Sequence, residues 1–230
     1  MHFHPLPFYK ALIVVAAIGT AYALAVTLGH APACVPNLEG CTSLSALGRT
    51  APESFVFRAL LIPVGVLTML YWVLNRQWLI LLGDDGRGGA RTMLVIGLMA
   101  GVAYIFYLSM LGADGQATKL IRGIWVTLFF AFMFLAQLFL VNRIWKLGPA
   151  VRVLLGWPYR VMLGVSVVQL VLGFLVVPIE AFARHADWAK NAVEWNFGLL
   201  LVIFYISSGF AWHRTGFQAS LSVNEERNNT

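Results

Sequence analysis

Charged residues are scarce in this chain: only 11% of its 230 residues are Asp, Glu, Lys or Arg, whereas 60% are hydrophobic. A soluble domain usually carries about 25% charged residues. The chain therefore has too few polar groups to cover a globular surface in water. Its mean hydropathy of +0.78 fits an exterior that faces lipid, and the composition predicts a polytopic membrane protein.

Acidic residues are the rarer charges, because ten Asp and Glu stand against sixteen Lys and Arg. The resulting net charge of +6 is modest, and the basic residues form no stripe suited to DNA. An excess of Lys and Arg is typical of cytoplasmic loops in membrane proteins. We therefore expect membrane lipids as partners and no nucleic acid.

Six apolar runs are long enough to cross a hydrocarbon core of about 30 Å as helices. Alternating ten-residue segments, which would indicate a membrane barrel, are absent. The sequence predicts an all-α bundle of six transmembrane helices in a single membrane domain, residues 1–230. The expected spans are residues 10–29, 55–74, 92–111, 119–141, 160–179 and 192–212.

The distribution of Lys and Arg predicts that both termini are cytoplasmic, because that orientation places ten basic residues inside and six outside. The inner set is Lys10, Arg76, Arg87, Arg91, Arg143, Lys146, Arg152, Arg160, Arg214 and Arg227. The outer set is Arg49, Arg58, Lys119, Arg122, Arg184 and Lys190. A cleavable signal is the alternative for the first span, but its apolar run is long for one.

Three segments outside the spans stand out. The loop at residues 30–54 is polar, rich in proline and placed outside by the topology, and the tail at about 216–230 is polar and expected to be disordered. The glycine-rich inner loop around residues 83–89 follows no strand. It therefore matches neither a phosphate-binding loop nor a dinucleotide-binding turn, and we expect no cofactor.

Cysteine is nearly absent: Cys34 and Cys41 are the two that occur, and both fall in the outer loop. An outward-facing pair in an oxidising compartment is most simply a disulfide that closes a small loop. Free thiols remain open as an alternative. A catalytic redox pair is disfavoured, because such pairs normally have two intervening residues rather than six.

Motifs for metal binding and for nucleophilic catalysis are also missing. No pair of histidines has the spacing of a helix-borne zinc site, so no metal is expected. His185 and Asp187 place an imidazole near a carboxylate, and Ser43 or Ser45 has the hydroxyl that a catalytic triad needs. The nucleophile-elbow motif is absent, so His185, Asp187 and Glu194 are weak catalytic candidates.

Ionisable residues gather where the spans begin on the outer side. Arg58 and Arg122 lie in the first turns of the second and fourth spans, Lys119 precedes Arg122 by three residues, and Glu194 opens the sixth span. Such residues at membrane depth are costly and are usually paired or functional. They predict either salt bridges between helices or a site in which Arg58, Lys119 and Arg122 hold an anionic head group beside Glu194.

The stretch VPNLEGCTSLSALGRTAPESFVFR, followed by Tyr71-Trp72, resembles the signature of a six-span membrane family. That family contains the damage-regulated autophagy modulators (DRAM), the FGF-receptor-activating protein and a post-GPI-attachment remodelling factor. The positions that carry the likeness are Pro36, Asn37, Ser43, Ser45, Gly48, Pro52, Glu53, Phe57, Arg58 and Glu194-Trp195. Cys41-Thr42 replaces a family proline, and Leu201 and Phe204 stand where the family has Asn and His.

The resemblance implies a cytoplasmic N-terminus and a role in lipid biology, since relatives act in GPI-anchor remodelling, phosphoinositide and sterol organisation, and autophagy. It adds Asn37, Ser43 and Ser45 to the expected head-group site. The main expectation is a protein that binds or organises lipids at the outer interface of the plasma membrane, or of the inner membrane in a bacterium. Alternatives are a lipid-modifying acyl transferase or hydrolase, and a small transporter or channel. Protein partners or a homo-oligomer formed through the membrane helices are also compatible with the sequence.

Overall fold

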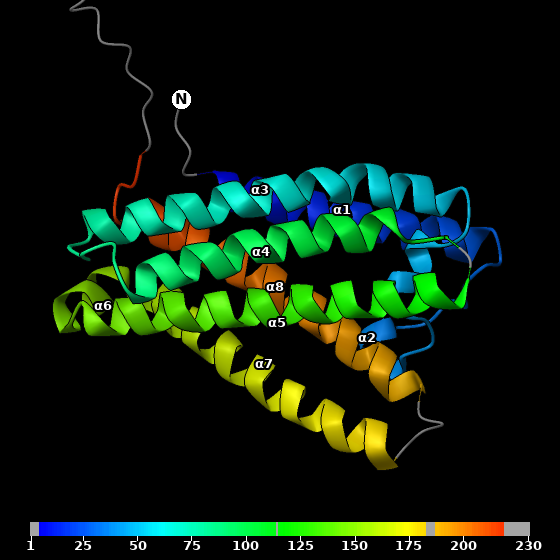
Figure 1. The fold of residues 1–230 in the computed structure, drawn as a ribbon. Coiled ribbons are helices and arrows are strands. Elements are labelled where there is room, and N and C mark those ends of the chain that lie inside the picture. Colours follow the sequence, from blue (N-terminus) through cyan, green and yellow to red (C-terminus); the bar gives the residue numbers. More distant parts are fainter. Residues whose placement is uncertain (1–4, 114, 183–186, 219–230) are drawn as a thin grey trace, which may run out of the picture.

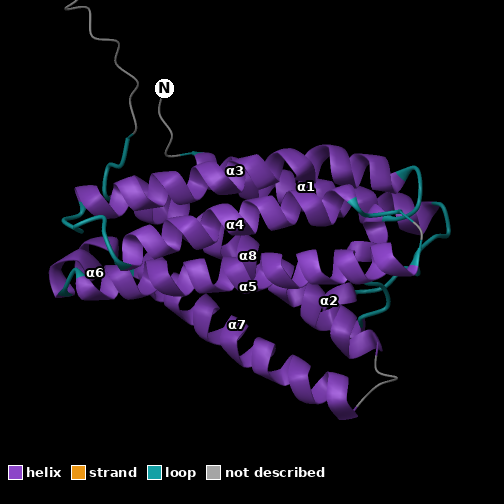
Figure 2. Ribbon diagram, viewed as in Figure 1, coloured by secondary structure: helices purple, strands orange, loops and turns teal. Residues whose placement is uncertain are grey.

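The computed structural model describes residues 5–113, 115–182 and 187–218, and the regular secondary structure of this part of the chain is helical (Figures 1 and 2). Six of its helices are long and apolar enough to cross a membrane. They are α1 (Leu6–Thr27), α3 (Glu53–Leu81), α4 (Gly89–Ser109), α5 (Gln116–Lys146), α7 (Trp157–Phe182) and α8 (Asp187–Arg214). The short elements are α2 (Pro36–Glu39), the 3-10 helix η1 (Leu44–Gly48) and α6 (Pro149–Leu155).

The six apolar runs predicted from the sequence are thus confirmed as helices, and every helix begins before its predicted run, although α1 and α4 end two residues before theirs. The fourth long helix, α5, has 31 residues, or about 46 Å of helix. That length exceeds a hydrocarbon core of about 30 Å, so hydropathy detects only the middle of the helix. The polar ends continue through the interfacial layers.

The long helices form a closed ring in which α5, α4, α3, α1, α8 and α7 follow one another, and α7 returns to α5. Figure 1 shows that α5 and α7 diverge toward the end of the bundle that carries α2. We call this the loop end, because residues 28–52 and η1 cover it. The opposite end, where α1 begins and α8 finishes, is the termini end.

Small residues let α3 and α4 approach closely. Gly97 and Gly101 of α4 form the small-xxx-small pattern that the sequence suggests. A Cβ atom added at Gly97 would collide with the Trp72 ring of α3, and one at Gly101 would lie 2.9 Å from the carbonyl oxygen of Gly65. Both glycines therefore serve helix packing.

The interior differs between the two ends. Aromatic rings fill the termini half, where Tyr71, Trp72, Trp78 and Trp212 are at most 1% exposed. In the loop half, the buried residues of α1 are the alanines Ala17, Ala21 and Ala25, and Leu47 of η1 closes the core from above. The small side chains on this face of α1 thus allow the loop to pack closely against the bundle.

Candidate functional site

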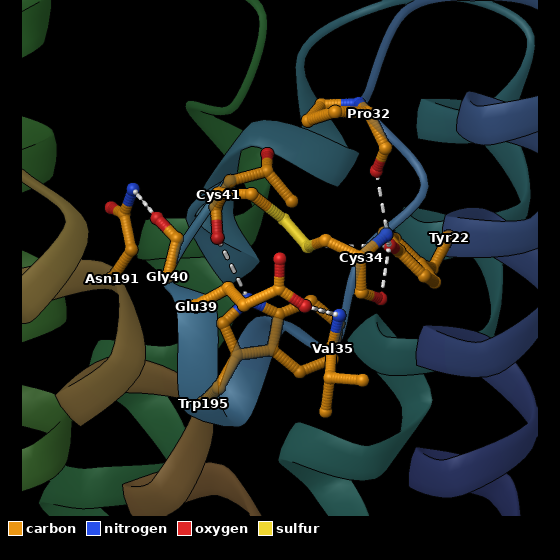
Figure 3. The surroundings of a disulfide bond; sticks show 10 residues. Tyr22, Pro32, Cys34, Val35, Glu39, Gly40, Cys41, Asn191 and Trp195 are labelled. Carbon is orange, nitrogen blue, oxygen red and sulfur yellow. Dashed lines mark hydrogen bonds between the residues drawn. A yellow bond between two sulfur atoms is a disulfide. The ribbon is translucent and has the colours of Figure 1, made fainter.

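The loop from Cys34 to Gly48 is fastened at its start by a disulfide between Cys34 and Cys41 (Figure 3). Tyr22 of α1 holds the same point, because its hydroxyl donates to the Cys34 carbonyl (2.9 Å) and accepts from the Cys34 N–H (3.0 Å). The Val35 N–H donates to Glu39 (2.8 Å). This part of the loop is therefore a small closed unit attached to α1.

Side chains of α8 hold the other face of the loop. They donate to three loop carbonyls at 2.8–2.9 Å: Asn191 to Gly40, Trp195 to Thr42, and Asn196 to Asn37. Figure 3 shows Asn191 and Trp195 reaching the loop from α8. The loop is thus positioned by helices from both ends of the sequence.

Gly40 is required for this contact. Its φ of +58° lies in the left-handed region, and a Cβ atom there would collide with the backbone of Trp188. Only glycine can adopt this positive φ and approach the neighbouring backbone this closely without strain. The close approach of loop and helix is therefore built into the sequence at this position.

A groove of about 770 Å³ lies at the loop end between α5, α7 and α8. Its walls are mainly apolar and include Phe130, Phe134, Leu170, Phe174 and Phe197. Leu170 and Phe174 of α7 are 40% and 70% exposed, so this wall borders the space that lipid would occupy. Gly173 lies between them and leaves room along the groove.

Four cations line the same groove: Arg49, Lys119, Arg122 and Lys190. Lys119 and Arg122 are three residues apart on α5 and share a face, as their spacing predicts. Within the described part of the chain, Lys119, Arg122 and Lys190 form neither a hydrogen bond nor a salt bridge with another side chain. Arg49 donates to the Ser45 hydroxyl (2.8 Å).

Glu194 is the acidic residue among those that line the groove. It lies on α8, and its Oε1 accepts a hydrogen bond from the Ser45 N–H of η1 (3.2 Å). Ser45 also lines the groove. One rim of the groove is therefore formed by the Glu194 carboxylate of α8 together with Ser45 of the loop.

The structure brings Lys119, Arg122, Glu194 and Ser45 together but places the other predicted head-group residues elsewhere. Arg58 donates to the carbonyls of Leu111 (3.1 Å) and Ser54 (3.2 Å), away from the groove. Ser43 caps η1 by accepting from the Ala46 N–H, and Asn37 contributes its carbonyl to the α8 contact.

Of the weak catalytic candidates, Asp187 is exposed at the start of α8 and is not part of the groove lining. His185 lies outside the described residues. Within those residues no three His, Cys, Asp or Glu side chains come close enough to hold a metal ion.

Several groove residues were not predicted as site residues, among them Lys190, Arg49 and Gln169. Lys190 precedes Glu194 by four residues on one helix, so the i,i+4 spacing contains a signal for it. Arg49 reaches the groove through the fold of the loop, which local spacing does not reveal. Gln169 was expected only to join helices, yet it lines the groove.

A second, enclosed cavity of about 50 Å³ lies inside the bundle, beneath Leu44 of η1. Tyr107, Phe130 and Glu194 line both this cavity and the groove. These three side chains therefore form the wall between the bundle interior and the groove.

Lys10 occupies an unexpected place. The sequence predicts it at the inner interface, but α1 begins at Leu6 and Lys10 is fully buried inside the bundle. Its ammonium lies 3.8 Å from the ring centre of Tyr205 and 4.8 Å from that of Tyr71, with no hydrogen-bond partner among the described residues. Aromatic rings are thus its surroundings.

The two aspartates of the loop between α3 and α4, at the termini end, are paired. Arg143 of α5 bonds Asp84 at 2.7 Å and Asp85 at 3.1 Å in the loop between α3 and α4. Arg76 donates to the carbonyl of Gly86 in the same loop (3.0 Å). Burial acts to raise the pKa of Asp84, but hydrogen bonds from Arg143 and the Gly86 N–H outweigh it and hold that pKa below its ordinary value.

A family model described as the N-terminal domain of Frag1, DRAM, Sfk1 and Cwh43P matches residues 2–212. The chain belongs to this family. Searches of curated proteins and of solved structures found no match. The match confirms the resemblance of the loop stretch and extends it over all six long helices of this Frag1/DRAM-family protein.

The signature segment of the Frag1/DRAM-family protein has a visible structural role. The stretch from Asn37 to Gly48 forms the loop that α8 holds and that supplies Ser45 to the groove rim. Glu194-Trp195, the matching pair in the last span, supplies two of the contacts that hold this loop. The motif residues therefore meet in space although about 150 residues separate them.

Proposed function

We propose that this Frag1/DRAM-family protein binds an anionic lipid in the groove between α5, α7 and α8. The supporting observation is the gathering of four cations on the groove, of which Lys119, Arg122 and Lys190 have no partner within the described residues. Lys119 and Arg122 lie in the first two turns of α5, at one end of a helix longer than a hydrocarbon core, so they reach the level of the lipid phosphates. A phosphate group offers Arg and Lys strong, charge-assisted hydrogen bonds.

The apolar walls of the groove match the apolar part of such a ligand. Below the cations the groove is lined by Phe130, Phe134 and Phe174, which suit an acyl chain and not a polar solute. Because Phe174 is exposed beside the groove, a lipid reaches the site by sideways diffusion within its leaflet. The site thus matches an amphiphile in charge and in polarity.

The loop end faces outward in this proposal. Disulfides persist in oxidising compartments, and Cys34–Cys41 lies at the loop end. The excess of Lys and Arg at the termini end agrees with a cytoplasmic position for that end. The ligand then comes from the outer leaflet of the plasma membrane, or of the inner membrane in a bacterium.

The lipids that co-purify with the full chain test this function. The protein is purified in mild detergent, and its lipids are quantified by mass spectrometry against those of the starting membrane. We expect enrichment of phosphate-bearing anionic lipids in wild type. The double variant Lys119→Gln/Arg122→Gln should reduce it tenfold or more, because hydrogen bonds to charged groups each contribute about 1.5–3 kcal/mol.

Arg91→Gln is the matched control, since Arg91 is an exposed cation in the first turn of α4 at the termini end. It should leave the enrichment as in wild type. Equal enrichment in wild type and in the Lys119→Gln/Arg122→Gln variant would show that the groove is not the lipid-binding site.

Glu194 also favours the second candidate function, a lipid-modifying enzyme. Its carboxylate lines the groove beside Ser45, where a carboxylate can act as a general base. Such an enzyme would convert the co-purified lipid on incubation with fresh membrane, with a lyso-lipid gained or lost. Turnover that stops in Glu194→Gln supports catalysis, and turnover that is equal in the two proteins removes Glu194 as the base.

A further inference from the structure

Lys10 is an ionisable side chain deep inside the membrane-spanning bundle. Its level follows from its contacts, because the ammonium lies over the rings of Tyr205 on α8 and Tyr71 on α3. Tyr71 precedes the last residue of α3 by ten residues, or about 15 Å of helix. Ionisable residues at such depth are rare and commonly mark ion pathways and proton relays.

Polar side chains continue from this ammonium toward the termini end. Asn75 of α3 and Ser208 of α8 lie beside the Tyr71 hydroxyl, and all three residues are fully buried. About one turn nearer the termini end, the Trp78 indole N–H donates to the Thr215 hydroxyl (2.9 Å). Groups that can accept or donate a hydrogen bond therefore reach from the bundle interior to the termini end.

The enclosed cavity of about 50 Å³ continues from Lys10 toward the loop end. Tyr205 lines the cavity, and the centre of its ring is 3.8 Å from the Lys10 ammonium. Glu194 also lines the cavity, eleven residues before Tyr205 on α8, or about 16 Å away. The other hydroxyl-bearing residues of its lining are Thr68, Tyr104 and Tyr107.

The size of the cavity limits what it can hold. Its volume of about 50 Å³ exceeds the roughly 10–15 Å³ that one water molecule requires. It has room for a few water molecules, but a hydrated ion or a larger solute does not fit. A proton, which moves between fixed groups and water, is the charge that such a space can pass.

The polar groups together extend across the hydrocarbon core. From Glu194 to Thr215 the chain of α8 advances by 21 residues, or about 31 Å. This length matches a hydrocarbon core of about 30 Å. Lys10 lies between the two, at the level of Tyr205.

We infer that the bundle interior is a proton pathway between the groove and the termini end, in which Lys10 carries the proton. Glu194 lines both the groove and the cavity, and its carboxyl group can take a proton on one side and release it on the other. Water in the cavity then relays the proton. The Lys10 ammonium passes one proton to the hydroxyl groups on its termini side, and the resulting amine takes the next proton from the cavity. Each step moves one proton, and the gradient or potential across the membrane drives the flow.

Tyr205 is the gate of this pathway. It lines the cavity, and its ring covers the Lys10 ammonium, which has no hydrogen-bond partner among the described residues. Proton transfer from the cavity therefore requires that this ring turn away. The structure is thus the closed form of the pathway, and movement of the ring limits the flux.

Proton flux into liposomes tests the pathway. The full chain is reconstituted in neutral phosphatidylcholine with a trapped pH-sensitive dye, and an outward potassium gradient with valinomycin makes the interior negative. We expect the interior to acidify several-fold faster than in protein-free liposomes. Lys10→Met should return the rate to the protein-free value, and Glu194→Gln, which has no ionisable carboxyl group, should lower it. The control is Lys146→Met, an exposed lysine in the last turn of α5, which should retain the wild-type rate.

Lys10→Arg separates proton transfer from a purely electrostatic role. A guanidinium retains the positive charge but cannot be deprotonated in proteins, so the flux should be lost although the charge remains. Loss of flux through unfolding is distinguishable, because removal of an unpaired buried ammonium in Lys10→Met should stabilise the bundle. Circular dichroism of each reconstituted variant checks the fold.

The outcomes decide the inference without involving lipid binding. A wild-type rate equal to that of protein-free liposomes would overturn the pathway. Equal rates in wild type and Lys10→Met, or a wild-type rate in Lys10→Arg, would overturn the role of Lys10 as proton carrier. An unchanged rate in Glu194→Gln would overturn the entry of protons from the groove.

Discussion

Arg143 at one end of this bundle and the groove cations Lys119 and Arg122 at the other have opposite roles. At the termini end Arg143 is paired with Asp84 and Asp85 in the adjoining loop. At the loop end Lys119 and Arg122 line a groove without a partner within the described residues. A basic residue thus holds a loop in place at the termini end, whereas the basic residues of the groove are available to bind a ligand.

The interiors repeat this contrast. Trp72, Trp78 and Trp212 fill the termini half. The ion pair of Arg143 and Asp84 therefore lies at the end of the bundle whose interior is well packed. The loop half has a groove of about 770 Å³ and an enclosed cavity beside it. A fold that packs one end tightly can keep space for a ligand at the other.

Arg143→Gln and Arg122→Gln should have opposite consequences. Arg143→Gln leaves the Asp84 side chain, 1% exposed, without its cation and should lower the free energy of unfolding by about 3 kcal/mol. Arg122→Gln removes an unpaired charge and should change it by less than about 0.5 kcal/mol. Denaturant unfolding in detergent measures both, and similar losses in the two variants would abolish the contrast.

Removing the disulfide should affect the loop end alone. In Cys34→Ser/Cys41→Ser the short loop regains freedom in the unfolded chain, which lowers stability by about 2 kcal/mol. Lipid binding should weaken as well, since the loop supplies Ser45 and Arg49 to the groove. Hydrogen exchange should report faster exchange in residues 34–48 and no change near Arg143. Spread of the change to the termini end would show that the two ends are coupled.

Lys10→Met tests whether the unpaired ammonium among the aromatic rings of the termini half destabilises the fold. The two ring contacts of the ammonium contribute about 2 kcal/mol when desolvated, less than the several kcal/mol that burying an ion costs. Methionine should therefore raise the free energy of unfolding by about 1 kcal/mol. Thermal unfolding followed by circular dichroism measures this change, and a clear loss of stability would mean that Lys10 has a partner or a ligand.

Acid should weaken the termini end first. The pKa of Asp84 is held below its ordinary value, so its ion pair stabilises the fold above the ordinary carboxyl pKa. That stabilisation is lost as the pH falls through the lowered pKa. The unfolding midpoint should decline in acid for wild type and less steeply for Asp84→Asn, which has no carboxylate to protonate. Parallel pH curves would contradict the assignment.

The sequence allows the six spans to be predicted because hydropathy depends on composition alone. The extra turns at the ends of α3 and α5 escape it, since polar residues in a helix beyond the hydrocarbon resemble a loop. Lys10 was misplaced for this reason, because α1 starts one turn before the apolar run. Helix length is therefore the weaker part of such a prediction.

The groove could be predicted only in part. Lys119 and Arg122 share a helix face by their spacing, and Ser45 and Glu194 belong to the motif that carries the family resemblance. The contribution of Arg49 depends on how the loop folds over α8, and that of Gln169 on the angle between α5 and α7. Neither is a property of local sequence. Arg58 was expected with this group, but the Leu111 carbonyl holds it elsewhere.

The position of the bound lipid tests the central claim most directly. A phosphatidic acid with a photoactivatable diazirine in its acyl chain is cross-linked to the full chain in nanodiscs, and the labelled residues are identified by mass spectrometry. We predict labels on groove residues such as Phe130, Phe134 and Phe174, and their loss in Lys119→Gln/Arg122→Gln. Labels spread evenly over the lipid-facing helices, and unchanged in the double variant, would contradict the account.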